Sequence, residues 1–169
     1  MIRYIGIDPG SRGSIAAIDD YGVIAIEDLS NDIKDYERLL YTWKDTKDVF
    51  DETYVTVEDV CGRPGQSCVA NTTFMKLAGM AELLGYNIST EGFLKVKPQV
   101  WKRHFDLIFD KSISKTEKKH KSIELAKELF PAVADQLTAS KDGRAEALLI
   151  ALYGKEKGFE RHCTEDIRG

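Results

Sequence analysis

Residues 2–10 read IRYIGIDPG, and this stretch decides how the beginning of the chain folds. Its Ile and Tyr residues favour a β-strand, whereas Pro9 and Gly10 favour a turn. We therefore expect a strand over residues 2–8 that ends at Asp8. The Asp8 carboxylate would then lie at the rim of a sheet, close to the side chains that end the neighbouring strands.

The rest of the chain alternates between strand and helix patterns. The other expected strands are 13–18, 23–26, 54–58 and 93–96, the last with Ile88 close by. The expected helices are 32–45, capped by Asn31 or Asp32; 69–84, closed by Gly85; a basic helix that begins at Pro98; a helix from Ile123 to Leu129 that ends before Pro131; and 142–156. The first strands would form an antiparallel meander, and the whole pattern predicts an α/β fold with helices on both faces of a five-stranded mixed sheet. We expect one domain over 1–157 and a polar C-terminal tail over 158–169.

The composition excludes several classes of protein. The 169 residues are 43% hydrophobic and 31% charged, which is typical of a globular domain and not of a disordered or collagen-like chain. No apolar run approaches the roughly 20 residues that cross a membrane. The first residues also lack the features of a secretory signal, so we expect a cytoplasmic protein without a membrane partner. Cys61, Cys68 and Cys163 are odd in number and lack zinc-ligand spacing, which predicts three reduced thiols.

Positive charge is concentrated in one segment of the chain. The net charge is −4, which by itself argues against a nucleic-acid partner. Between Lys95 and Lys121, however, nine Lys and Arg residues stand against three Asp and Glu residues. This basic segment could bind a polyanion with one face, or it could form a solvated helix surface. Composition leaves both interpretations open.

Four carboxylates are candidates for one metal-binding rim. Asp8 and Glu58 each end a predicted strand, and if these strands are parallel neighbours their ends lie about 5 Å apart. Asp142 and Glu146 are four residues apart, so both lie on one face of the last helix. Clustered carboxylates need a counter-charge, and hard divalent cations such as Mg²⁺ take oxygen ligands. The pattern predicts a two-metal centre for phosphodiester cleavage.

These acids also have ordinary structural interpretations. Asp8 before Pro-Gly is typical of a turn, Asp142 is typical of a helix N-cap, and Glu146 could be a solvated side chain. Glu58 has few structural roles, because it ends a β-branched strand ahead of a loop rich in Gly and Pro. Asp59 points to the opposite face of that strand, so only one of these two acids can join Asp8.

Four segments in this order resemble the RuvC-type Holliday junction resolvases, including phage-like members: IGIDPGS at 5–11, VEDV at 57–60, the pair Val96-Lys97, and AEALLIA at 145–151. The resemblance covers residues 2 to about 154. It implies a ribonuclease H-like fold, a homodimer, and Mg²⁺-dependent paired nicking of four-way DNA junctions, with two ions per active site and Mn²⁺ as a substitute. It also implies the cytoplasm of a bacterial cell or a phage-infected host, and no nucleotide cofactor.

The resemblance assigns roles to individual residues. The catalytic and metal-binding carboxylates would be Asp8, Glu58, Asp142 and Glu146. The pair formed by Asp142 and Glu146, an Asp and a Glu four residues apart, departs from the bacterial pattern of two aspartates three residues apart. Lys97 and Lys119 resemble lysines near the scissile phosphate, with Lys119 the catalytic one and Lys115 and Lys118 as alternatives to it. The expected DNA-binding residues are Arg63, Lys97, Lys102, Arg103, Lys115, Lys118 and Lys119.

Two further features concern the substrate and the assembly. Cys61 stands where the bacterial enzymes have an aromatic residue that stacks on junction bases, so we expect broader action on branched DNA with little sequence preference. The small residues of the AGMA stretch at 78–81 allow two backbones to approach closely. In the family this helix lies at the dimer interface, and ordinary packing on the sheet is the alternative.

Other functions share parts of this pattern. A nuclease of the same fold that cuts flaps, forks or RNA–DNA hybrids would have the same site. A non-catalytic junction-binding protein would use the acids only as surface charge. The segment from Asp8 to Ile18 also resembles the first phosphate loop of actin-like sugar kinases and ATPases. The chain is too short for the two domains of those proteins and shows no second phosphate loop.

Overall fold

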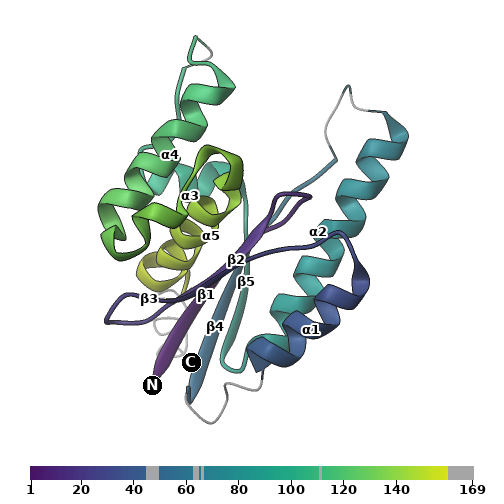
Figure 1. Cartoon of the computed structure of the whole chain (residues 1–169), viewed down its shortest axis with the longest axis vertical. Coiled ribbons are helices and arrows are strands. Elements are labelled where there is room, and N and C mark those ends of the chain that lie inside the picture. Colours follow the sequence, from purple (N-terminus) through teal and green to yellow (C-terminus); the bar gives the residue numbers. More distant parts are fainter. Residues whose placement is uncertain (45–49, 63–64, 66, 111, 160–169) are drawn as a thin grey trace, which may run out of the picture.

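A five-stranded mixed sheet with the strand order β3-β2-β1-β4-β5 forms the centre of the molecule (Figure 1). The structure is a computed structural model, which describes residues 1–44, 50–62, 65, 67–110 and 112–159. The strands are β1 (Ile2–Asp8), β2 (Ser14–Ile18), β3 (Val23–Asp28), β4 (Glu52–Glu58) and β5 (Gly92–Val96). The first three strands form the predicted antiparallel meander, and β4 pairs in parallel with both β1 and β5.

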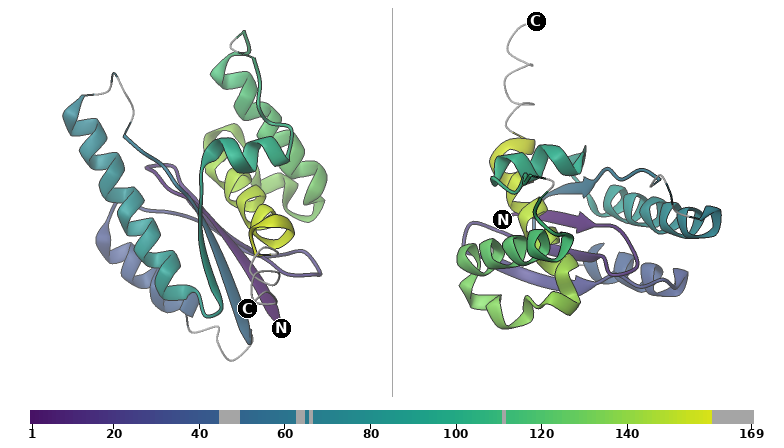
Figure 2. Two further views of the ribbon diagram at one scale, coloured as in Figure 1. Left: turned by 180° about the vertical axis from the view of Figure 1, so that it is seen from behind. Right: turned by 90° about the horizontal axis from the view of Figure 1, so that it is seen from above.

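Helices cover both faces of this sheet, as the sequence predicted (Figure 1, Figure 2). On one face α1 (Ile33–Lys44) and α2 (Cys68–Ile88) pack together. On the other face α5 (Asp142–Tyr153) lies against β1 and β2, and α3 (Pro98–His104) and α4 (Lys115–Leu129) pack against α5. Short helical turns follow α4 and α5, at Pro131–Gln136, Ala139–Lys141 and Gly154–Gly158. No helix in these described ranges is long and apolar enough to span a bilayer.

The close approach of α5 to β1 depends on a glycine. A Cβ at Gly6 would lie 2.1 Å from the carbonyl oxygen of Ala147 and 2.3 Å from the backbone nitrogen of Ala151. Because both are backbone atoms, no side-chain movement could accommodate a larger residue. The buried face of α5 is accordingly rich in alanine and leucine, and the helix is held against the strand that ends at Asp8.

The structure corrects the predicted end of α2. We expected Gly85 to close this helix and Ile88 to lie near the next strand, but Gly85 is inside α2 and Ile88 is its last residue. A Cβ at Gly85 would lie 2.9 Å from Cγ2 of Val57 and 3.1 Å from Cγ1 of Val55. Glycine is therefore present because the helix packs closely on β4, and not because the chain turns.

The beginning and the end of α5 also differ from the prediction. Lys141, and not Asp142, holds the N-cap position, and Asp142 is the first helical residue. The predicted helix over 142–156 changes after Tyr153 into a π-helical turn that ends at Gly158. Phe159, predicted to belong to a polar tail, packs against Tyr54 with 4.8 Å between the ring centroids. The rest of that tail, 160–169, lies outside the described residues.

Candidate active site

The carboxyl ends of β1 and β4 place two of the predicted acids at one rim of the sheet. The parallel register sets Ile7 opposite Val57, so Asp8 and Glu58 follow at the ends of adjacent strands. Asp8 is partly buried, and Glu58 is only 8% exposed. The two strands are thus the parallel neighbours that the shared rim of Asp8 and Glu58 requires.

The first two turns of α5 bring the other two acids to the same rim. A Cβ at Gly143 would lie 2.2 Å from the carbonyl oxygen of Arg12 and 3.0 Å from Oδ2 of Asp8. Glycine at this position therefore lets the start of α5 lie directly on the loop between β1 and β2. Asp142 precedes this contact, and Glu146 follows it by less than one helical turn.

The four acids influence one another most strongly at Asp8. Burial raises the pKa of Asp8 well above its usual value, and the charges of Glu146, Glu58 and Asp142 raise it further. The nearby Lys102 ammonium acts in the opposite direction. Asp8 is thus the electrostatic centre of the cluster formed by Asp8, Glu58, Asp142 and Glu146, which we call the acid cluster.

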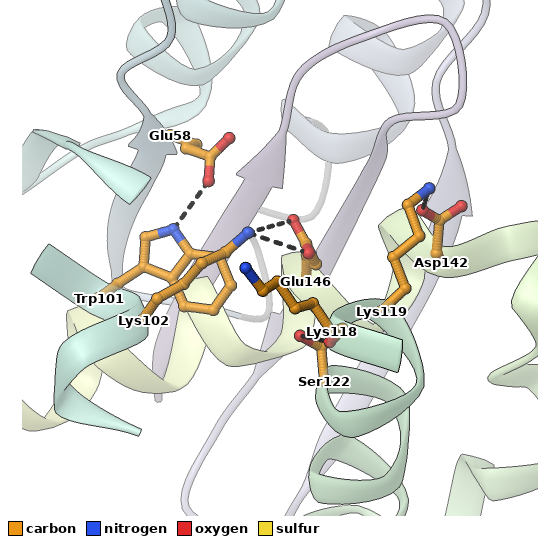
Figure 3. Close-up of polar contacts among 8 residues, drawn as sticks. All are labelled: Glu58, Trp101, Lys102, Lys118, Lys119, Ser122, Asp142 and Glu146. Carbon is orange, nitrogen blue, oxygen red and sulfur yellow. Dashed lines mark hydrogen bonds and ion pairs between the residues drawn. The ribbon is translucent and has the colours of Figure 1, made fainter. Parts of the chain in front are cut away.

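Two lysines from the basic segment pair with the acids of α5 (Figure 3). Lys102 Nζ lies 3.1 Å from Oε1 and 3.3 Å from Oε2 of Glu146. Lys119 Nζ pairs with Oδ2 of Asp142. Burial opposes the charge on Lys102, but Glu146 and Glu58 favour it more strongly, so the pKa of Lys102 is raised above its usual value. Lys102 therefore remains charged at neutral pH and neutralises part of the acid cluster.

A buried tryptophan holds Glu58. The indole N–H of Trp101 donates a hydrogen bond to Oε1 of Glu58 at 2.9 Å, and the Trp101 side chain is completely buried (Figure 3). The Lys102 ammonium lies 4.8 Å from the centroid of the same ring. Adjacent residues of α3 thus hold two different acids of the cluster.

The role of Trp101 was not predicted from the sequence, and Lys102 was predicted only to bind DNA. The sequence nevertheless contains a signal for the roles of both Trp101 and Lys102. Pro98 begins α3 directly after β5, whose last residue, Val96, pairs with Glu58 in the sheet. Residues one turn into α3 therefore start from the same rim as the acids, and an aromatic donor beside a lysine is suited to hold carboxylates.

The other predicted DNA-binding residues differ in exposure. Lys97, at the N-cap position of α3, Arg103 and Lys115 are exposed, whereas Lys118 is partly buried on α4. Of Lys115, Lys118 and Lys119, all within the described part of the chain, Lys119 is the one that the structure pairs with an acid of the cluster. Arg63 lies outside the described residues.

The acid cluster has the donor chemistry of a site for a hard cation. Four carboxylates face two paired ammonium groups, so negative charge remains when every acid is ionised. Oδ1 of Asp142 is buried and has no hydrogen-bond partner among the described residues. Carboxylate oxygens are the ligands that Mg²⁺ prefers. The residue types therefore fit a divalent cation.

The arrangement of these acids is not that of a preformed metal site. Within the ranges that the structure covers, no three or more His, Cys, Asp and Glu side chains form a group that could hold a metal ion. The carboxylates of Glu146 and Asp142 are instead paired with the ammonium groups of Lys102 and Lys119. A cation that used these carboxylates would have to replace the lysines.

The strand order and the helices on both faces define an α/β fold of the ribonuclease H-like type, as predicted. Comparison with protein-family models finds no match, and neither does comparison with the sequences of curated proteins. Among solved structures, RuvC from T. thermophilus in complex with Holliday junction substrate matches 90% of this chain and 95% of that chain. The TM-score is 0.55 and the sequence identity is 13%, a level at which the likeness establishes the fold.

Proposed function

We propose that this protein is a metal-dependent endonuclease that resolves four-way (Holliday) DNA junctions by paired symmetric nicks, in recombination, repair or phage DNA processing. The observation that carries the proposal is the convergence of Asp8, Glu58, Asp142 and Glu146 on one rim of a ribonuclease H-like sheet. The solved structure with the same fold contains Holliday junction substrate, which supports a branched DNA as the ligand.

The four acids are the residues that would hold Mg²⁺, or Mn²⁺ in its place, with two ions per active site. Such ions supply an activated water nucleophile and stabilise the leaving oxygen during phosphodiester cleavage. The charges of the other three acids all raise the pKa of Asp8, so we assign Asp8 the central ligand position. Lys119 reaches the cluster from α4 and would neutralise charge that develops on the phosphate.

Exposed basic residues next to the cluster supply a surface for the DNA backbone. Lys97 at the N-cap of α3, Arg103 on α3 and Lys115 on α4 are exposed, and lysines of the same two helices reach the acids. Charges of this kind bind phosphates without reading sequence. Cys61, in place of a stacking aromatic residue, is exposed in the loop after β4. We therefore propose similar cleavage rates on junctions of different core sequence.

We also propose a homodimer that forms through the outer face of α2. Met75, Gly79, Leu83 and Tyr86 lie on this face at helical spacing, and the side chains of Leu83 and Tyr86 are 64% and 66% exposed. A groove of about 460 Å³ between α1 and α2 continues the apolar surface, with Ile33, Tyr36, Leu40, Met80 and Leu83 among its lining residues.

Contiguous exposed apolar surface of this kind marks an interaction site. The AGMA stretch at 78–81 serves both of the roles considered above. Gly79 is exposed on the proposed dimer face, whereas Ala81 is buried and packs on the sheet. Two-fold symmetry would supply two active sites, which paired nicking requires.

Cleavage of an end-labelled immobile four-way junction tests the proposed function. The junction is compared with its linear duplex and with a flap, each with Mg²⁺ and with EDTA. Wild type should give paired, metal-dependent nicks in the junction alone, and Asp8→Asn should bind the junction without cutting it. Asp59→Asn is the matched control, because Asp59 follows Glu58 but pairs with Lys95 outside the acid cluster.

The outcomes separate the alternatives. Equal cleavage of the flap would indicate a nuclease that acts on branched DNA in general. Tight junction binding by wild type without any nick would indicate a non-catalytic junction-binding protein. Wild-type turnover by Asp8→Asn would show that the active site is assigned to the wrong residues.

A further inference from the structure

Lys102 brings a positive charge into the acid cluster. Its ammonium group contacts both carboxylate oxygens of Glu146, at 3.1 and 3.3 Å, and lies 4.8 Å from the centre of the Trp101 ring. The Lys102 side chain is 28% exposed and that of Glu146 is 17% exposed. This ion pair is therefore partly buried. At such a site the attraction between opposite charges is stronger than at a fully exposed one.

The position of this ammonium group conflicts with cation binding by Glu146. Both oxygens of the carboxylate are already engaged by a charged donor, whereas Glu58 receives a hydrogen bond from the neutral indole of Trp101. A divalent cation that approached Glu146 would meet the like charge of Lys102. The absence of a group of acids arranged to hold a metal, among the described residues, agrees with this arrangement.

Lys102 differs in this respect from Lys119. Lys119 reaches Asp142 with a side chain that is 43% exposed, so water and salt screen its charge more strongly. Lys102 contacts both the Trp101 ring and Glu146, and its side chain is less exposed, at 28%. Of these two lysines, Lys102 is therefore the stronger competitor for a cation.

We propose that Lys102 is a placeholder cation, which neutralises the acid cluster before metal binding and is displaced from Glu146 when a divalent cation binds. Lys102 thereby lowers the affinity of the cluster for metal and sets the concentration at which the site is loaded. This inference rests on the proposed function, because it assumes that the acid cluster binds a divalent cation.

The test measures Mn²⁺ binding to the DNA-free protein by isothermal titration calorimetry. Lys102→Met should bind Mn²⁺ about tenfold tighter than wild type, a factor that corresponds to roughly 1.4 kcal/mol. Lys127→Met is the matched control, since it removes the same charge from an exposed position near the end of α4. Its affinity should stay within about twofold of wild type, because exposed charges are screened.

Two further measurements keep the result interpretable. Lys102→Gln retains most of the side chain and a donor for Glu146 without the charge, and it should also bind Mn²⁺ more tightly than wild type. The rise in melting temperature on adding Mn²⁺ should be larger for both Lys102 variants than for Lys127→Met.

Equal or weaker Mn²⁺ binding by both Lys102 variants would overturn the inference while leaving the proposed metal site in place. If neither wild type nor any variant bound Mn²⁺, the metal-dependent function itself would be refuted, and the inference with it.

Discussion

The hydrogen bond from Trp101 to Glu58 should contribute measurably to stability. In the variant Trp101→Phe the indole N–H is lost and part of a fully buried ring is removed. Loss of a buried hydrogen bond to a charged group costs about 1.5–3 kcal/mol. The smaller ring leaves unfilled space, which adds about 1–2 kcal/mol. We expect Trp101→Phe to lower the free energy of unfolding by about 2.5–5 kcal/mol in total.

A double-mutant cycle with Glu58→Gln isolates the hydrogen bond from the packing. The Gln carbonyl can still accept from the indole, but this neutral hydrogen bond contributes only about 0.5–1.5 kcal/mol. Trp101→Phe should therefore be less harmful in the Glu58→Gln background, by about 1–2 kcal/mol. Glu58→Gln alone relieves the repulsion of Asp8 but also weakens the hydrogen bond from Trp101 and the attraction to Lys102, so its own effect is measured as one corner of the cycle.

Urea unfolding in EDTA, followed by circular dichroism, measures all four corners of the cycle. The control cycle replaces Trp43, whose indole donates to Glu27 on the other side of the sheet at 3.1 Å. Trp43→Phe and Glu58→Gln should be additive within about 0.5 kcal/mol. A coupling energy below that limit for the Trp101 and Glu58 pair would refute the claim that the tryptophan holds the carboxylate.

Three further predictions concern the acid cluster, the packing of α5 and the dimer. Burial and the neighbouring acids raise the pKa of Asp8, so its ionised form destabilises the fold, and Asp8→Asn should raise the melting temperature in EDTA. In calorimetry, the melting temperature of Asp8→Asn should exceed that of wild type by the full amount at pH values above the raised pKa of Asp8 in the folded protein. The difference should vanish at pH values below the pKa of Asp8 in the unfolded chain. Gly6→Ala should lose more than about 3 kcal/mol in urea unfolding, because its Cβ would overlap the backbone of α5. In the same assay Gly62→Ala, whose Cβ would make only an ordinary contact with the Asn71 side chain at 3.7 Å, should change stability by less than about 0.5 kcal/mol. Leu83→Glu should give a monomer in sedimentation velocity, whereas Ile108→Glu, an exposed site outside α2, should leave the dimer intact.

The strands could be predicted because their signals are local. β1 and β4 combine β-branched or aromatic residues with turn or loop residues after Asp8 and Glu58, and these signals do not depend on distant parts of the chain. The end of α2 could not be predicted in this way. Gly85 has the same sequence context whether it ends a helix or allows close packing on a strand, and only the contact with Val57 distinguishes the two.

The acids of the site could be proposed for the same local reason, but their partners could not. A lysine in a basic segment looks the same in the sequence whether it is solvated or paired. In the structure Lys102 and Lys119 pair with acids of the cluster, and Lys95 pairs with Glu82 at 2.9 Å. The count of basic residues therefore overstates the positive charge that is free to bind DNA.

The origin of the charges explains why the site depends on the order of the chain. The acids come from strand ends and from the start of α5, whereas the lysines come from α3 and α4, which lie between β5 and α5 in the sequence. The segment from α3 to α4 thus places two lysines against the acids, and its other basic residues, such as Arg103 and Lys115, are exposed. A phosphate that binds there offers the paired lysines an alternative anion, and a metal ion offers the acids an alternative cation. Exchange of these partners would convert the site from its lysine-paired form into one that holds metal and phosphate.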